Sequence, residues 1–204
     1  MYSCRSVIVL FLYAAYCASA QGQATQPVDV LKEAVTLGEA LKGEGYVYPK
    51  AGQASTVKTV DCTQFIARLV GKLIPHLPAA ARKRITMSDL TAEQVTTNKD
   101  DIITGSDSRT KGVQQALIDL DRGEAVALGN AAPGDLVQYW MRQNNGKWFG
   151  HAGVVERVEK AHGGEVLAWL YGSHLSKDGI GTAPDHGLRL VEDDDRKIYI
   201  VRFK

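Results

Sequence analysis

The chain has 204 residues, of which 45% are hydrophobic, and its 24 Lys and Arg residues nearly balance 23 Asp and Glu residues to give a formal net charge of +1. This balance excludes the strongly basic surface by which proteins bind the nucleic-acid backbone. The sequence has no Gly-x-Gly-x-x-Gly or phosphate-loop pattern and no HExxH or paired-cysteine spacing, so it does not indicate nucleotide binding or a structural zinc site.

The first 20 residues have the features of a secretion signal. Arg5 gives a basic start, the apolar run after it is too short to span a bilayer, and "ASA" at positions 18–20 resembles a signal-peptidase site. We therefore expect residues 1–20 to be a signal peptide and the protein to be exported, periplasmic or secreted, without stable membrane insertion. Lipid anchoring at Cys17 is an alternative. We expect residues 21–204 to form a single domain.

Cys62 would be the only cysteine of the mature chain, because Cys4 and Cys17 lie within the expected leader. A single cysteine cannot form an internal disulfide. It is therefore a buried inert thiol, part of an intermolecular bridge, or a reactive nucleophile.

Two amphipathic helices are expected in the first part of the chain. In the segment 27–45, one face of a helix is expected to carry Val28, Leu31, Val35, Gly38 and Leu41. After a loop, a second apolar face begins at Phe65 and runs to the proline at position 75. Asp61 is placed to cap this helix, which puts Cys62 in the first turn, where the helix dipole and unpaired backbone N–H groups favour a thiolate.

Residues 76–131 predict a helical and loop elaboration. Short helices are expected in 78–85, 87–98 and 111–123, with a loop at 100–112. The remainder turns to strands rich in β-branched and aromatic residues at 134–140, 151–158, 165–172, 188–191 and 198–203. Their short connections predict antiparallel neighbours, so we expect an α+β fold with N-terminal helices packed on a mostly antiparallel sheet of about five strands.

A reactive Cys62 needs a base, and His151 is the best candidate among the histidines. It opens an expected strand and is followed by Ala152 and Gly153, small residues that permit another element to approach closely. The other histidines outside the next strand, His76, His162 and His186, are expected at the surface. The third group of a triad is expected at the end of the following strand, where Ser173 or, preferably, His174 could accept the Nδ1–H of His151.

Three segments resemble the NlpC-type cysteine peptidases of the papain-like clan. "VDCTQFI" resembles their nucleophile motif, "PGDLVQYW" a strand motif, and "GHAGVVERV" the strand that bears the basic histidine. The motifs span Asp61 to His174 in the expected order, although 76–131 has no counterpart. Thr63-Gln64 replaces the usual Ser-Gly after the cysteine, and "GYVYPKAG" lacks the Trp-Gly-Gly that commonly follows the family's tyrosine.

The resemblance implies a cell-wall hydrolase that cuts amide bonds in the peptide stems of peptidoglycan. Cys62, His151 and His174 would be catalytic, while Tyr48, Asp61 and Ser173 would contribute to oxyanion or substrate binding; Tyr46 is the alternative to Tyr48. No metal or organic cofactor is expected, and the acidic run at 192–196 is read as a solvated turn. Peptidoglycan is the expected partner, with no nucleic acid.

Two alternatives stay open. The related CHAP-type N-acetylmuramoyl-L-alanine amidases have a cysteine and a histidine in the same order and cut between sugar and peptide. A non-catalytic cell-wall binding module is also open, because Thr63-Gln64 and the missing Trp-Gly-Gly depart from the peptidase pattern.

Overall fold

The computed structural model describes residues 28–91, 94, 99–160, 163–175, 179–183 and 187–204. The expected leader at 1–20, with its cysteines, lies outside the described residues, as do His162 and His186. The helical elements are α1 (Val30–Gly43), α2 (Cys62–Leu73), α3 (Ala79–Ile85), α5 (Lys99–Thr104), η1 (Ser108–Lys111), α6 (Val113–Asp119) and η2 (Leu128–Asn130). None of the described helices is long and apolar enough to cross a membrane.

The strands form one seven-stranded sheet, whose named strands all pair antiparallel. The sheet order is β1-β7-β2-β3-β4-β5, with β6 also paired to β4. The strands are β1 (Gly123–Val126), β2 (Leu136–Arg142), β3 (Trp148–Lys160), β4 (Val166–Ser173), β5 (Ile180–Thr182), β6 (Leu188–Arg189) and β7 (Arg196–Phe203). The α+β class is confirmed, with two more strands than expected because the short β1 and β5 carry no strand pattern of their own.

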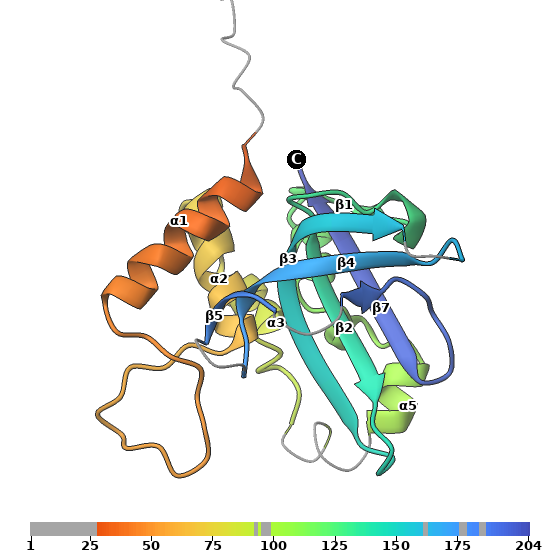
Figure 1. Cartoon of the computed structure of the whole chain (residues 1–204), viewed down its shortest axis with the longest axis horizontal. Helices are drawn as coiled ribbons and strands as arrows, with labels where there is room; N and C mark the ends of the chain where they lie inside the picture. The colour runs from red at the N-terminus through yellow and green to blue at the C-terminus, as the bar shows by residue number, and fades with distance from the viewer. Residues whose placement is uncertain (1–27, 92–93, 95–98, 161–162, 176–178, 184–186) are drawn as a thin grey trace, which may run out of the picture.

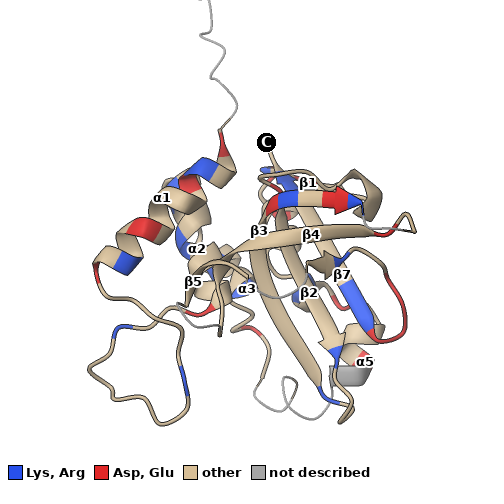
Figure 2. Ribbon diagram, in the orientation of Figure 1, with Lys and Arg blue, Asp and Glu red and all other residues tan. Residues whose placement is uncertain are grey.

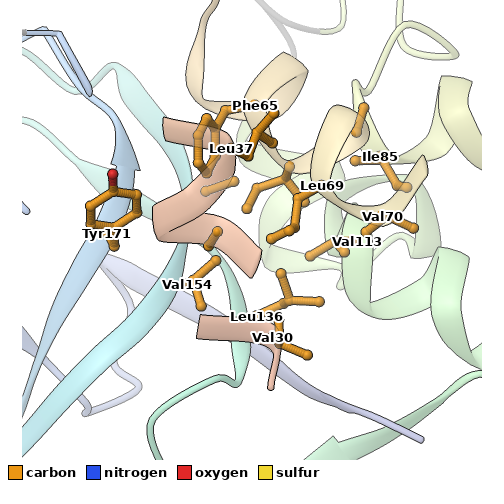
Figure 3. Packing of buried hydrophobic residues seen from close by; sticks show 14 of the residues in the cluster. Val30, Leu37, Phe65, Leu69, Val70, Ile85, Val113, Leu136, Val154 and Tyr171 are labelled. Carbon is orange, nitrogen blue, oxygen red and sulfur yellow. The ribbon is translucent and has the colours of Figure 1, made fainter. Parts of the chain in front are cut away.

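The helices α1 and α2 lie together beside the long central strands (Figure 1). The main core fills the space between helices and sheet, with Phe65 and Leu69 of α2 packed near Leu136 and Val154 of the sheet (Figure 3). Alternate residues of the same strands, such as Val137 and Val155, form a second cluster on the opposite face. The sheet is therefore buried on both faces in its middle.

The face that α1 buries includes Gly38 and Leu41 of the predicted face but differs from it at Val28 and Val35. Val28 and Val35 are exposed, whereas Val30, Ala34 and Leu37 point into the core. These three residues are also spaced at i, i+4 and i+7, so the sequence offers two overlapping apolar stripes and packing against the sheet selects one. Basic and acidic residues are mixed along α1, which contains Lys32, Glu33, Glu39 and Lys42 (Figure 2).

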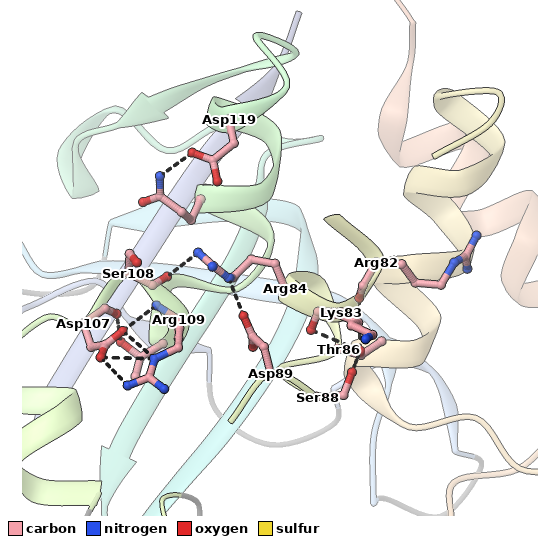
Figure 4. Close-up of polar contacts among 12 residues, drawn as sticks. Arg82, Lys83, Arg84, Thr86, Ser88, Asp89, Asp107, Ser108, Arg109 and Asp119 are labelled. Carbon is pink, nitrogen blue, oxygen red and sulfur yellow. Dashed lines mark hydrogen bonds and ion pairs between the residues drawn. The ribbon is translucent and has the colours of Figure 1, made fainter. Parts of the chain in front are cut away.

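The segment 76–131 contributes to the helical core. Ile85 of α3 and Val113 of α6 belong to the main cluster. Arg84 joins this layer to the next loop, since its Nε donates to Asp89 at 2.7 Å and its Nη1 to the carbonyl oxygen of Ser108 at 3.5 Å (Figure 4). The predicted loop at 100–112 was wrong in its first part, where α5 forms and buries Ile103 beside two tryptophans.

Candidate active site

Asp61 begins the helix that carries Cys62. Its Oδ1 accepts hydrogen bonds from the backbone N–H of Gln64 at 2.7 Å and from the Thr63 hydroxyl at 2.9 Å. Gln64 reciprocates, because its Oε1 accepts the backbone N–H of Asp61 at 3.1 Å. This capping box fixes where α2 starts and confirms the predicted N-cap, with Cys62 as the first helical residue.

Two contacts hold the start of α2 against the sheet. The Ser173 hydroxyl donates to the carbonyl oxygen of Val60 at 2.6 Å, tying the end of β4 to the chain just before the helix. The backbone N–H of Ala152 on β3 lowers the pKa of Cys62, so the thiol lies next to this strand. The thiol is therefore buried against the residue that directly follows His151, with Cys62 only 6% exposed.

The register of the sheet brings His151 and His174 together. Val154 of β3 pairs with Tyr171 of β4, and continuing this antiparallel register by three residues sets His151 opposite His174. Residues directly opposite each other point to the same face of a sheet. Accordingly, Nε2 of His151 lies 2.8 Å from Nδ1 of His174.

Hydrogen-bond partners determine which ring nitrogens carry protons. The Nε2 atom of His174 lies 3.0 Å from the carbonyl oxygen of Gly181, which can only accept, so this nitrogen donates. The Nδ1 atom of a neutral His174 then accepts the Nε2–H of His151, and Nδ1 of His151 is left as its basic nitrogen. The sequence prediction that His151 would donate through Nδ1 was wrong, because ring orientation depends on contacts that sequence spacing does not specify.

Aromatic rings surround His151. Tyr139, its cross-strand partner on β2, meets it edge to face with ring centroids 5.6 Å apart, and Phe149 stacks on it at 6.1 Å. Burial in this setting, together with the repulsion from a charged His174, lowers the pKa of His151 to about 3. Burial also lowers the pKa of His174. Both imidazoles are therefore neutral at pH 7.

The Cys62 thiol is also neutral at pH 7, contrary to the prediction of a favoured thiolate. Burial raises the pKa of Cys62 to about 11, and the Asp61 carboxylate adds to the increase. The backbone N–H groups of Ala152, Thr63 and Cys62 lower this pKa, as expected near a helix N-terminus, but their effect is smaller than that of burial.

The two candidate tyrosines separate in space. Burial and nearby negative charge at Cys62 and Asp61 raise the pKa of Tyr48 to about 12, and Tyr48 lines the pocket next to the histidines. Tyr46 instead packs against the core, with the Arg68 guanidinium 4.9 Å from its ring centroid. Of the two tyrosines, Tyr48 is therefore the one that lines the pocket with the histidines.

A pocket of about 280 Å³ opens beside the histidine pair on the face opposite the main helical core. Tyr48, Tyr139, His151 and His174 contribute polar atoms, and an apolar wall is formed by residues including Met141, Phe149, Leu170 and Leu188. This combination of an apolar wall with a few convergent polar groups is typical of ligand sites. Ser173 and Asp61, which were predicted to bind substrate, are instead engaged in the contacts that hold α2 in place.

Four residues of this pocket were not predicted from the sequence: Tyr139, Phe149, Arg189 and Arg196. The short turn "QNNGK" between β2 and β3 indicates that these strands are neighbours, so Tyr139 could be expected near His151. Which residue of β2 lies directly opposite His151 depends on the register that the turn sets, and the sequence does not specify it. Among the described residues, no group of three or more His, Cys, Asp or Glu side chains is arranged to hold a metal ion.

Comparison of the chain with protein-family models, curated proteins and solved structures gives no match in any of the three.

Proposed function

We propose that the protein is an exported cysteine hydrolase of the NlpC type, acting on amide bonds in the peptide stems of peptidoglycan. The observation that carries this proposal is the pair His151 and His174, 2.8 Å apart, on a strand whose next residue, Ala152, lowers the pKa of Cys62 through its backbone. Cys62 does not line the pocket beside the histidines, so the proposal requires the substrate carbonyl to lie between that pocket and the start of α2. Cys62 lies in the first of the motifs that resemble this family, and His151 and Ala152 lie in the third, whereas His174 lies outside all three. The motif resemblance alone supports peptidoglycan as the substrate.

In the proposed reaction, Cys62 attacks the carbonyl carbon while its thiol proton passes to Nδ1 of His151. Because both groups are neutral in the free protein, this proton transfer accompanies attack. The Cys62 N–H and the Tyr48 hydroxyl stabilise the oxyanion. His151 then returns the proton to the leaving amine as the C–N bond breaks, giving a thioester.

Water completes the cycle by attacking the thioester carbonyl. His151 takes a proton from the water and returns it to the departing sulfur, so the products are a carboxylic acid, an amine and the regenerated thiol. His174 keeps Nε2 of His151 protonated throughout and so leaves Nδ1 available for proton transfer.

The proposal is tested by incubating the purified protein with peptidoglycan sacculi and identifying soluble fragments by mass spectrometry. The parent protein is expected to release fragments, and Cys62→Ala and His151→Ala are expected to release none while remaining folded by circular dichroism. Equal release by Cys62→Ala, or none by the folded parent, would contradict the proposal. Fragment masses also separate an endopeptidase from a CHAP-type amidase, because only the amidase frees intact stems.

A binding module is the second candidate, favoured by the buried Cys62 thiol and its raised pKa. Under this alternative the pocket holds a cell-wall ligand without cutting it. Co-sedimentation of the parent protein with intact sacculi, without release of fragments, would support the module over the hydrolase.

A further inference from the structure

Arg196, the first residue of β7, lies on the same face of the sheet as His151. His151 is opposite Tyr139 on β2, Met141 follows Tyr139 by two residues, and Met141 is opposite Arg196. Each of these steps preserves the face of the sheet. Both Arg196 and His151 accordingly line the pocket described above.

The Arg196 guanidinium has unused hydrogen-bond donors. Its Nε and Nη1 atoms are buried, and within the described part of the chain neither has a hydrogen-bond partner. A buried donor without a partner is unfavourable, and more so when it is charged. The other arginine of the pocket, Arg189, differs because its guanidinium is paired with Glu165.

Among the described residues, the neighbouring carboxylates leave Arg196 available. The turn before β7 is acidic and the strand itself begins with two cations (Figure 2). Asp193 is bonded to Arg196 through the main chain only, and Asp195 lies 3.9 Å from Nη1 of Arg142. Both aspartates line a second hollow, which Met141, Phe149 and Arg196 share with the first pocket. Arg196 therefore stands where the two hollows meet.

We propose that Arg196 forms a subsite that binds a carboxylate of the substrate. A guanidinium offers two parallel donors, which fit a carboxylate, and the low polarity of the surrounding Met141 and Phe149 strengthens such a pair. Two strand spacings and two residues separate Arg196 from His151, which puts their Cα atoms about 12 Å apart. Because the arginine side chain covers part of this separation, we expect the bound carboxylate to lie about one or two substrate residues from the bond that is cut.

This inference rests on the proposed function for its substrate, so its test has one arm that needs no catalysis. In the first arm, the Arg196 Nε–H and the His151 ring are followed by NMR in the Cys62→Ala protein as glutarate, a dicarboxylate probe, is added. We expect saturable shifts that are absent in Cys62→Ala/Arg196→Gln and retained in Cys62→Ala/Arg189→Gln. No shift, or equal shifts in both arginine variants, would overturn the subsite.

In the second arm, cleavage is compared between native sacculi and sacculi whose carboxylates have been converted to methylamides. The parent protein is expected to prefer native sacculi, and Arg196→Gln to lose about 10- to 100-fold in rate on native sacculi while losing little on the amidated ones. Arg196→Lys should restore part of the preference. Equal loss on both substrates would overturn the subsite, whereas glutarate binding without any cleavage would retain it and reject the hydrolase.

Discussion

The Nε2 atom of His151 and the Nδ1 atom of His174 lie 2.8 Å apart, and the carbonyl oxygen of Gly181 accepts the remaining N–H of His174. A backbone carbonyl therefore fixes the proton position on one imidazole, and that imidazole fixes it on the next. The basic nitrogen of His151 is thus determined by a chain of contacts that ends on β5.

His174 is expected to act by positioning His151. In His174→Ala the Nε2–H of His151 loses its acceptor, so we expect kcat to fall about 10- to 100-fold with KM changed much less. His174→Asn can offer an acceptor oxygen and should recover part of the loss. Steady-state kinetics on a released stem peptide would measure kcat and KM for each variant. A fall in KM with kcat unchanged would contradict the positioning role of His174.

Ser173→Ala is the matched control at the neighbouring position. The Ser173 hydroxyl donates a hydrogen bond to the Val60 carbonyl oxygen. Its removal should therefore reduce the free energy of unfolding by about 1 kcal/mol while kcat stays close to the parent value. A loss of kcat as large as that of His174→Ala would mean that Ser173 has a catalytic role that the hydrogen bond does not account for.

Asp61 is expected to affect stability and thiol reactivity separately. Asp61→Asn keeps the Oδ1 acceptor of the cap but removes the charge that helps to raise the pKa of Cys62, so alkylation by iodoacetamide at pH 8 should become several-fold faster. Asp61→Ala should also lower the free energy of unfolding, by about 1 kcal/mol, through loss of the cap. An unchanged alkylation rate in Asp61→Asn would contradict the expected effect of the Asp61 charge on the pKa of Cys62.

Some of this site could be predicted from the sequence, and some could not. The Asp61 cap and the first-turn position of Cys62 follow from local pattern, and the nearness of His151 to His174 from their places on successive strands. The ring nitrogen that His151 uses, the burial that raises the pKa of Cys62 and the isolation of Arg196 depend on tertiary packing. Residues distant in the sequence create these properties, so no local spacing reports them.

The buried histidines should make the protein less stable in acid. The pKa of His151 is lowered to about 3 in the folded state, so below its ordinary value of 6.5 the unfolded chain binds the proton first. The contribution of His151 to the free energy of unfolding is therefore fully present above pH 6.5. It falls as the pH drops from 6.5 toward 3, by up to about 1.4 kcal/mol per pH unit. His174 acts in the same direction.

Urea denaturation between pH 7 and pH 5 would measure this loss. His151→Gln is expected to show a shallower decline in unfolding free energy than the parent, whatever its stability at pH 7. Acidic groups such as Asp107, whose pKa is lowered by Arg109, are common to both proteins and do not affect the difference. Equal slopes would contradict a buried neutral His151.

Gly38 and Tyr171 are expected to be coupled in stability. A Cβ atom at Gly38 of α1 would lie 2.1 Å from the Tyr171 hydroxyl oxygen and 2.9 Å from ring atom Cζ. Gly38→Ala should therefore destabilise the protein by about 1–3 kcal/mol, although alanine favours a helix over glycine by about 1 kcal/mol.

Tyr171→Phe is the partner change. The Tyr171 hydroxyl is buried and has no hydrogen-bond partner within the described residues, so its removal should leave the unfolding free energy unchanged or slightly higher. It also removes the atom that meets the new Cβ, and the double variant should recover about 1 kcal/mol relative to the sum of the single changes. Chemical denaturation of the four proteins measures this coupling. Strict additivity would show that α1 moves away from β4 instead of pressing on the ring.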